Sequence, residues 1–299
     1  MGARGGTVRR ETGMSMRRAY ASIRGGQVHY VEAGQGPVLL LMHSAPRSSR
    51  AYRFLLPLLA PHFRCIAPDL PGFGQSDPLG GPVTMEALGA AMVEFLGSMG
   101  IARAHVFGYH TGNKVAAAMA ANHPDAVERV ILCGQIHSII PDKDARNAAI
   151  HHIVDKYFTR YPDSPGGDQH LRRWMADWSD ITGFGVPRAI FAKPVVTAAD
   201  IEELKIRLLD HVQALSAIGA TYGANFEFDF AGAIARIAAP TLLLELVMQD
   251  EEHYGRQLEA VCRLNPRVTG ATILNAGRVA LESHTSELAG QIGCFLQEV

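Results

Sequence analysis

Residues 106–112 have the sequence VFGYHTG, and this stretch decides the fold. The apolar run Ala104–Phe107 is typical of a buried strand, and the small residues of Thr111–Asn122 are typical of a helix. Between them, the Gly-x-x-x-Gly pattern predicts a tight turn. A strand, a sharp turn and a helix in this order make a nucleophile elbow, whose strained turn presents one side chain to a site. The residue at the tip of this predicted elbow is His110, where the usual pattern has serine.

Short apolar runs on both sides of the elbow predict a parallel sheet, because strands of such sheets are buried on both faces. Helical patterns separate these runs, so the sequence predicts an α/β fold with a doubly wound, mostly parallel sheet. The predicted strands are 27–32, an antiparallel edge strand, and 38–43, 63–68, 104–107, 127–133, 240–247 and 271–274. The predicted core helices are one that ends at Ala60, and 85–99, 111–122, 254–263 and 286–298.

The alternation of strands and helices stops in the middle of the chain, where helical patterns cover 142–159, 169–180 and 198–217. We therefore predict a helical cap inserted at 136–225. The predicted organisation is a flexible tail at 1–16, a first core part at 17–135, the cap at 136–225 and a second core part at 226–299. Aromatic residues that we expect to pack the cap and line an apolar pocket are Trp174, Trp178, Phe184, Tyr222, Phe226, Phe228 and Phe230.

The composition argues against several classes of function. With 28 basic and 29 acidic residues, the net charge of -1 indicates neither a nucleic acid nor a membrane surface as partner. No apolar run is long enough to span a membrane and no signal-peptide pattern is present, so we expect a cytoplasmic protein. The four cysteines form no C-x-x-C pair. His151 and His152, with Asp155 on the same predicted helix, could suggest a metal site, but no third well-spaced ligand is evident. We expect no metal and no other cofactor, and the sequence leaves a homodimer open.

Several motifs, in the expected order, resemble the α/β-hydrolase superfamily over roughly residues 20–299. The sequence DLPGFGQSD at 69–77 is similar to the superfamily's D-x-x-G-x-G-x-S loop. His43 and the loop after it stand where the superfamily has its His-Gly oxyanion segment, and 240–247 looks like the strand that leads to the catalytic acid. With its cap, the chain resembles haloalkane dehalogenases, epoxide hydrolases and C–C hydrolases. The resemblance implies the α/β-hydrolase fold and a site beneath the cap.

The resemblance also implies a catalytic triad, and two of its three positions are atypical here. His110 stands at the nucleophile position, Asp250 at that of the acid, and Arg278 at that of the histidine. An arginine keeps its proton near neutral pH, so Arg278 cannot act as a general base. The oxyanion hole would be formed by the backbone N–H groups of Ser44 and Thr111.

Several residues near these positions have two interpretations. Arg278 either forms an ion pair with the acid or binds a substrate carboxylate or enolate. His284 is either a displaced triad histidine or a surface residue in the first turn of the closing helix. His43 is favoured as a structural residue that orients the oxyanion loop, and His137 either faces the site or packs at the cap hinge. Arg47 is interpreted as a solvated loop residue in preference to one that points into the entrance.

Two functional hypotheses follow. In the first, the protein is an enzyme that acts on a small, mostly apolar carbonyl compound, with His110 as general base or nucleophile. The reaction would be hydrolysis of an ester, lactone or C–C bond, or proton transfer of the lyase, decarboxylase or cyclase type. In the second, the protein has lost its triad and is a catalytically inactive ligand-binding or scaffold protein.

Overall fold

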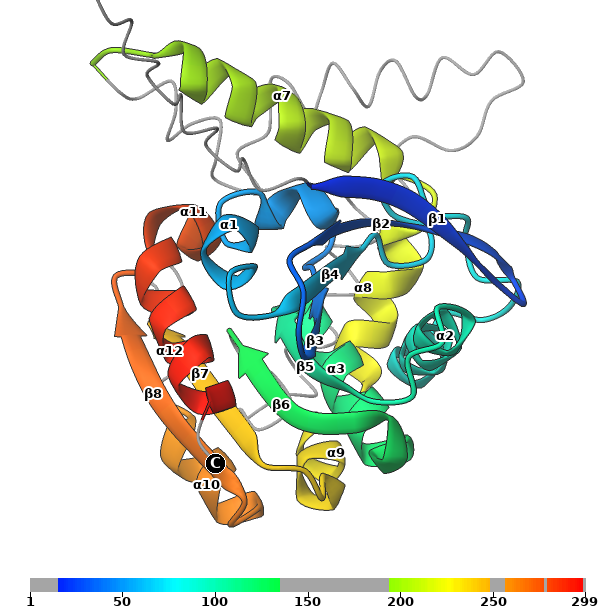
Figure 1. Ribbon diagram of the computed structural model, residues 1–299, viewed down its shortest axis with the longest axis vertical. Helices are drawn as coiled ribbons and strands as arrows, with labels where there is room; N and C mark the ends of the chain where they lie inside the picture. Colours follow the sequence, from blue (N-terminus) through cyan, green and yellow to red (C-terminus); the bar gives the residue numbers. More distant parts are fainter. Residues whose placement is uncertain (1–15, 135–193, 248–255, 277–278, 298–299) are drawn as a thin grey trace, which may run out of the picture.

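The computed structural model describes residues 16–134, 194–247, 256–276 and 279–297. In these parts of the chain, eight strands form one sheet in the order β1-β2-β4-β3-β5-β6-β7-β8 (Figure 1). The pairs β1–β2 and β2–β4 are antiparallel and all other neighbours are parallel, so the sheet is mostly parallel, as predicted. The strand predicted at 27–32 as an edge strand is not at the edge, because β1 pairs with its outer side. The strands are β1 (Arg17–Ile23), β2 (Gly26–Ala33), β3 (Val38–Met42), β4 (Arg64–Pro68), β5 (Ala104–Tyr109), β6 (Val127–Cys133), β7 (Thr241–Val247) and β8 (Val268–Leu274).

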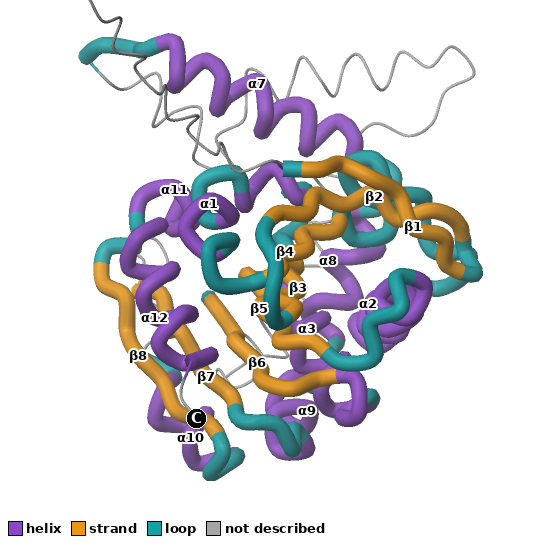
Figure 2. The backbone as a smooth tube through the Cα atoms, in the orientation of Figure 1, coloured by secondary structure: helices purple, strands orange, loops and turns teal. Residues whose placement is uncertain are grey.

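Helices cover both faces of this sheet (Figure 2). One hydrophobic cluster joins the sheet to α2, α3, α8, α9 and α10, and a second joins the opposite face to η1, α1, α11 and α12. The helices of the first face are α2 (Met85–Ser98), α3 (Thr111–Asn122), α8 (Ile218–Glu227), α9 (Phe230–Arg236) and α10 (Leu258–Leu264). Those of the second face are the 3-10 helix η1 (Ser49–Tyr52), α1 (Leu56–Leu59), α11 (Ala280–Ser283) and α12 (Thr285–Gln297). A second 3-10 helix, η2 (Pro124–Ala126), precedes β6.

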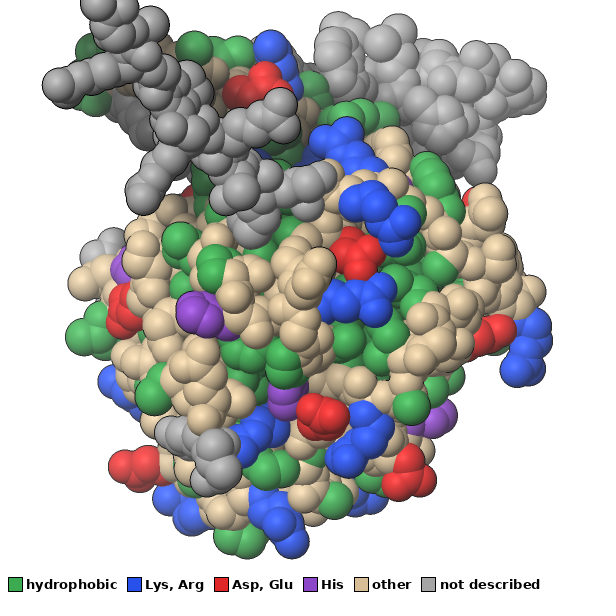
Figure 3. All heavy atoms as spheres, viewed as in Figure 1, with side chains coloured by type: hydrophobic (Ala, Val, Ile, Leu, Met, Phe, Trp, Pro, Cys, Tyr) green, Lys and Arg blue, Asp and Glu red, His purple; other side chains and the backbone are tan. Residues whose placement is uncertain are grey.

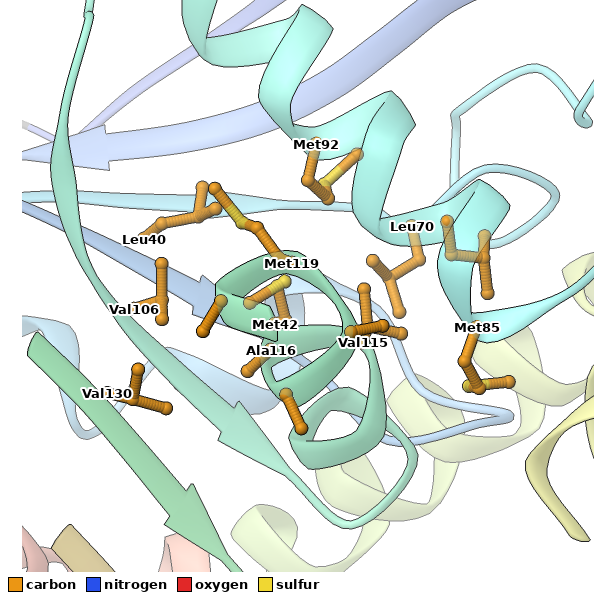
Figure 4. Packing of buried hydrophobic residues seen from close by; sticks show 14 of the residues in the cluster. Leu40, Met42, Leu70, Met85, Met92, Val106, Val115, Ala116, Met119 and Val130 are labelled. Carbon is orange, nitrogen blue, oxygen red and sulfur yellow. The ribbon is translucent and has the colours of Figure 1, made fainter. Parts of the chain in front are cut away.

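Each apolar strand contributes side chains to both clusters, because successive side chains of a strand point to opposite faces of the sheet. In β3, Leu40 and Met42 belong to the first cluster, whereas Leu39 and Leu41 belong to the second. Figure 4 shows the first cluster, in which Val115 and Met119 of α3 and Met85 and Met92 of α2 meet the strand side chains. A continuous apolar run is therefore what a central strand of this fold requires.

Most predicted boundaries agree with the structure, and β6 and α3 occupy the predicted residues. One strand was not predicted, since β1 consists largely of polar and small residues that show no apolar run. It forms a regular antiparallel ladder with β2, from Arg17 opposite Glu32 to Ile23 opposite Gly26. β8 begins at Val268 rather than at Ala271, because its first three residues continue the ladder with β7 although two of them are exposed.

The predicted cap is described only from residue 194 onward. Its third predicted helix is present as α7 (Ala198–Gln213), which begins with a capping box of Thr197 and Asp200 and ends four residues before the predicted end. Figure 1 shows α7 beyond the sheet, on the side toward which β6 and β8 point. The predicted helices 142–159 and 169–180, both tryptophans and residues 1–15 lie outside the described residues.

The face of the molecule in Figure 3 carries basic and acidic side chains side by side, without a large patch of one sign. Among the helices that the structure describes, none is both long enough and apolar enough to cross a membrane. The described aromatic residues of the predicted pocket pack against one another: the Tyr222 and Phe226 rings are 6.1 Å apart, and those of Phe228 and Phe230 are 6.0 Å apart.

Candidate active site

The turn between β5 and α3 has the strained backbone that the sequence predicts. His110 has a φ of 48° and a ψ of -107°, outside the regions that residues with a Cβ atom normally adopt. Two backbone hydrogen bonds hold this conformation. The His110 N–H donates to the carbonyl of Cys133 at 2.9 Å, and the His110 carbonyl accepts from the N–H of Asn113 at 3.0 Å. The imidazole is therefore presented at the carboxyl ends of β5 and β6.

Three glycines create the space that this turn needs. A Cβ atom on Gly108 would lie 2.1 Å from the carbonyl oxygen of Gly112, and one on Gly112 would lie 2.0 Å from that of Met42. Gly134, directly after β6, has a φ of +106°, and its Cβ would lie 2.8 Å from Nδ1 of His110. The Gly-x-x-x-Gly pattern of the sequence includes Gly108 and Gly112. The only sequence signal for Gly134 is its position directly after a predicted strand.

The imidazole of His110 is half-buried between Gly134 and a neighbouring aromatic ring. The ring of Tyr109 meets it edge-on, with the ring centroids 4.4 Å apart. The Tyr109 hydroxyl is buried and has no hydrogen-bond partner among the described residues. Burial raises the pKa of Tyr109 well above its ordinary value, so this hydroxyl stays protonated beside His110.

The predicted oxyanion donors, Ser44 and Thr111, lie on adjacent segments. β3 and β5 are neighbours with Met42 opposite Gly108, and Gly112 closely approaches the carbonyls of Met42 and His43. No described residue accepts a hydrogen bond from the N–H of Ser44 or of Thr111. The N–H of Thr111 has no acceptor within α3, because it belongs to the first helical residue. Two N–H groups next to the elbow are thus available to a developing negative charge.

His43 has the contacts of a structural residue. Its side chain is fully buried, and its Nε2 accepts a hydrogen bond from the N–H of Leu70 at 2.9 Å. Nδ1 therefore carries the proton and donates to the carbonyl of Ser44 at 3.0 Å. Burial lowers the pKa of His43, which keeps the ring neutral in this arrangement. His43 thereby links the loop of the predicted oxyanion donor to the loop at 69–77.

The carboxylate of Asp69 organises this second loop. It accepts hydrogen bonds from the N–H of Ser49 at 2.7 Å and of Gln75 at 2.9 Å, and lies 2.8 Å from Nδ1 of His29. Burial alone would raise the pKa of Asp69, but these hydrogen bonds outweigh it and lower the pKa to about 2. The D-x-x-G-x-G-x-S pattern therefore corresponds to a buried, ionised carboxylate that supports the segment after β3.

Comparison with known proteins agrees with this fold. A family model described as the alpha/beta hydrolase fold matches residues 37–166. Haloalkane dehalogenase 2 of Mycobacterium tuberculosis is 36% identical over 108 residues, which are 36% of this chain and 38% of the relative. The soluble epoxide hydrolase of Corynebacterium sp. strain C12 is 35% identical over 139 residues, 46% of this chain and 48% of the relative. The chain has the α/β-hydrolase fold.

Several solved structures share the fold over nearly the whole chain. The epoxide hydrolase CorEH has a TM-score of 0.68 at 21% identity, with 93% of this chain and 97% of that one covered. A thermophilic esterase from Thermogutta terrifontis has the same TM-score and identity, with 94% and 98% covered. The stretches that match the dehalogenase and the epoxide hydrolase in sequence span less than half of those relatives. Both of these relatives are hydrolases.

The interpretation of Arg47 as a solvated loop residue is wrong. Arg47 is only 8% exposed, and its Nε lies 3.3 Å from Oδ2 of Asp210 on α7. Its Nη2 lies 3.2 Å from Oε1 of Glu282 on α11. Burial would lower the pKa of Arg47, but the surrounding carboxylates outweigh it and raise the pKa. We define a charged cluster where the loop after β3, α7 and α11 meet: Arg47, Arg50, Arg53, Glu203, Arg207, Asp210 and Glu282.

Of the predicted triad in this α/β-hydrolase fold, the structure places only His110. Asp250, Arg278 and His137 lie outside the described residues, as do His151, His152 and Asp155. His284 is half-buried between α11 and α12, one residue before α12 begins, and its Nδ1 is 2.8 Å from the hydroxyl of Ser283. Within the described ranges, no group of three His, Cys, Asp or Glu side chains could hold a metal ion.

Proposed function

We propose that this protein is a hydrolase of a small, mostly apolar carbonyl compound, in which His110 acts as general base. The observation that supports this proposal is the strained elbow, which presents an imidazole near the N–H groups of Ser44 and Thr111, for which the described ranges contain no acceptor. An imidazole has the ordinary pKa best suited to proton transfer near neutral pH. The sequence relatives are hydrolases, which supports the same class of reaction.

In the proposed reaction, His110 takes a proton from a water molecule as the water oxygen attacks the carbonyl carbon of the substrate. The carbonyl oxygen becomes a tetrahedral oxyanion that accepts hydrogen bonds from the N–H groups of Ser44 and Thr111. The intermediate then collapses, the bond to the leaving group breaks, and the imidazolium returns its proton to the leaving group. Asp250 and Arg278 are proposed to orient the imidazole or the substrate, and the range 136–225 to cover the pocket.

A non-catalytic ligand-binding role is the second candidate. It is favoured by the elbow itself, which carries no serine, cysteine or aspartate at position 110. The two candidates differ in one measurable respect, because only the hydrolase needs the imidazole for turnover.

The test is hydrolysis of a panel of aryl esters, lactones and C–C substrates by wild type, His110→Ala and His62→Ala. His62 is exposed in the turn after α1 and serves as the matched histidine control. We expect His110→Ala to lower kcat/KM by about 10²–10⁴-fold, the usual contribution of a general base, and His62→Ala to leave it unchanged. Equal rates of wild type and His110→Ala on every substrate would exclude the enzymatic proposal.

Two further measurements define the role of the imidazole. A fluorophosphonate probe should not label the protein, because no serine stands on the elbow. Stoichiometric labelling would place the nucleophile elsewhere. Mass spectrometry after acid quench should show no acylated His110, whereas an acyl group on this residue would make it the nucleophile instead of the base.

A further inference from the structure

A fully buried carboxylate on α7, that of Asp210, holds the loop that follows Ser44. Its Oδ1 accepts from the hydroxyl of Ser48 at 2.6 Å and from Nε of Arg50 at 2.9 Å. Its Oδ2 accepts from Nε of Arg47 at 3.3 Å. Three residues, Arg47, Ser48 and Arg50, thus engage both carboxylate oxygens, and all three lie in the loop after β3 or in η1 that follows it.

This loop is connected directly to the predicted oxyanion donor. The N–H of Arg47 donates to the carbonyl of Ser44 at 2.7 Å, which closes a tight turn over residues 44–47. At the other end, the Ser48 hydroxyl caps η1 by accepting from the N–H of Arg50 at 3.3 Å. Asp210 therefore holds Arg47, the last residue of this turn, and Ser48, the residue after it, and Arg47 is bonded to Ser44 through its backbone.

From these contacts we propose that Asp210 is a positioning residue for hydrolysis. By holding Arg47 and Ser48, it keeps the N–H of Ser44 directed at the developing oxyanion. Since Asp210 lies on α7, docking of this helix completes the site. The inference rests on the proposed hydrolase function, and it assigns to the described part of the predicted cap a role in the chemistry in addition to covering the pocket.

The charged cluster also contains a matched control. Glu203 lies two turns before Asp210 on α7 and forms ion pairs with Arg53 and Arg207. Its closest approach to Arg47 is 3.9 Å, beyond hydrogen-bond distance. Substitution of Glu203 removes a half-buried carboxylate from the same helix and the same cluster, but leaves the three hydrogen bonds between Asp210 and the loop in place.

The proposal is tested with Asp210→Asn and Glu203→Gln, which remove the charge with little change of shape. For the best ester substrate of wild type, kcat and KM are measured together with inhibition by the matching phosphonate, an anionic tetrahedral analogue. We expect Asp210→Asn to lower kcat by about 10–100-fold, because a donor displaced by about 1 Å loses much of its effect on the transition state. KM should change less than about threefold, and phosphonate affinity should fall in parallel with kcat/KM.

Glu203→Gln should change kcat by less than about threefold, even if urea unfolding shows that it loses as much stability as Asp210→Asn does. Should Asp210→Asn fail to fold, Ser48→Ala removes one of the three hydrogen bonds and should lower kcat by a smaller factor, again with weaker phosphonate binding. The positioning role is overturned if Asp210→Asn keeps the kcat of wild type, or if Glu203→Gln loses kcat to the same extent. A wild type without His110-dependent turnover would instead overturn the proposed function.

Discussion

Replacing His110 by glycine should leave the protein more stable than replacing it by alanine. Alanine keeps a Cβ atom at the φ of 48° and ψ of -107°, whereas glycine adopts such angles without steric conflict. Both substitutions remove the same imidazole contacts, with Tyr109 and with Gly134, so these losses cancel in the comparison. The difference between the two variants therefore isolates the strain of the elbow.

The expected difference is worked from two opposing terms. A non-glycine residue held in a sparsely populated region costs about 1–3 kcal/mol, and glycine removes this cost. Glycine also loses more conformational entropy on folding than alanine does, which offsets about 0.4–1 kcal/mol. The free energy of unfolding should therefore be about 0.5–2 kcal/mol higher for His110→Gly than for His110→Ala. Both variants should show the same loss of kcat/KM, by about 10²–10⁴-fold, because both lack the imidazole.

Urea unfolding at 25 °C measures this difference, provided that the two variants share one m value. The control is the same pair of substitutions at His123, the C-cap at the other end of α3, where φ is -133°. At this φ alanine is not strained, so glycine has no steric advantage. The free energy of unfolding should therefore be about 0.4–1 kcal/mol lower for His123→Gly than for His123→Ala. If His110→Ala equals or exceeds His110→Gly in stability, the elbow stores no strain and this reasoning is wrong.

Three other predictions concern residues around the elbow. Gly134→Ala places a Cβ atom 2.8 Å from Nδ1 of His110, so the ring must move and kcat should fall by about 100-fold, whereas Gly97→Ala, with open space around it, should not change kcat in the same assay. His43→Ala leaves the buried N–H of Leu70 without its partner and should lower the free energy of unfolding in urea by about 1–3 kcal/mol. The pKa of Asp69 is lowered on folding from 3.8 to about 2, so its stabilisation of about 2 kcal/mol is present above pH 3.8 and lost as the pH falls through 2. Urea unfolding of Asp69→Asn should accordingly depend less on pH in this range than that of wild type, and an equal dependence would contradict the assignment.

The fold could be predicted because its strands and helices each have a recognisable pattern within a short stretch of sequence. The run in β3 is apolar at every position, as a strand covered on both faces must be, and α3 lies at the predicted residues because small side chains allow close packing on the sheet. β1 was not predicted, because an edge strand needs no apolar face and therefore has no local apolar pattern. It is defined by its pairing with β2.

The charged cluster could not be predicted, because burial of a charge depends on partners that are distant in sequence. Arg47 and Asp210 are separated by 163 residues, and neither has a local pattern that distinguishes it from a solvated residue. An arginine in a polar loop is more often exposed than buried. Only the packing of α7 and α11 against this loop surrounds Arg47 with carboxylates and reverses that expectation.

A second residue with positive φ shows why the conformation of His110 calls for a functional explanation. Asn275, with a φ of 56°, follows β8 in a turn, and asparagine is among the residues that tolerate positive φ best. No such local reason applies to His110, whose ψ of -107° lies outside the left-handed helical region. Glycine would satisfy the geometry of this turn without strain, as it does at Gly134 across the site. A histidine that is held there at a cost in stability, near two N–H groups that no residue in the described part of the chain engages, is best explained by what its imidazole does.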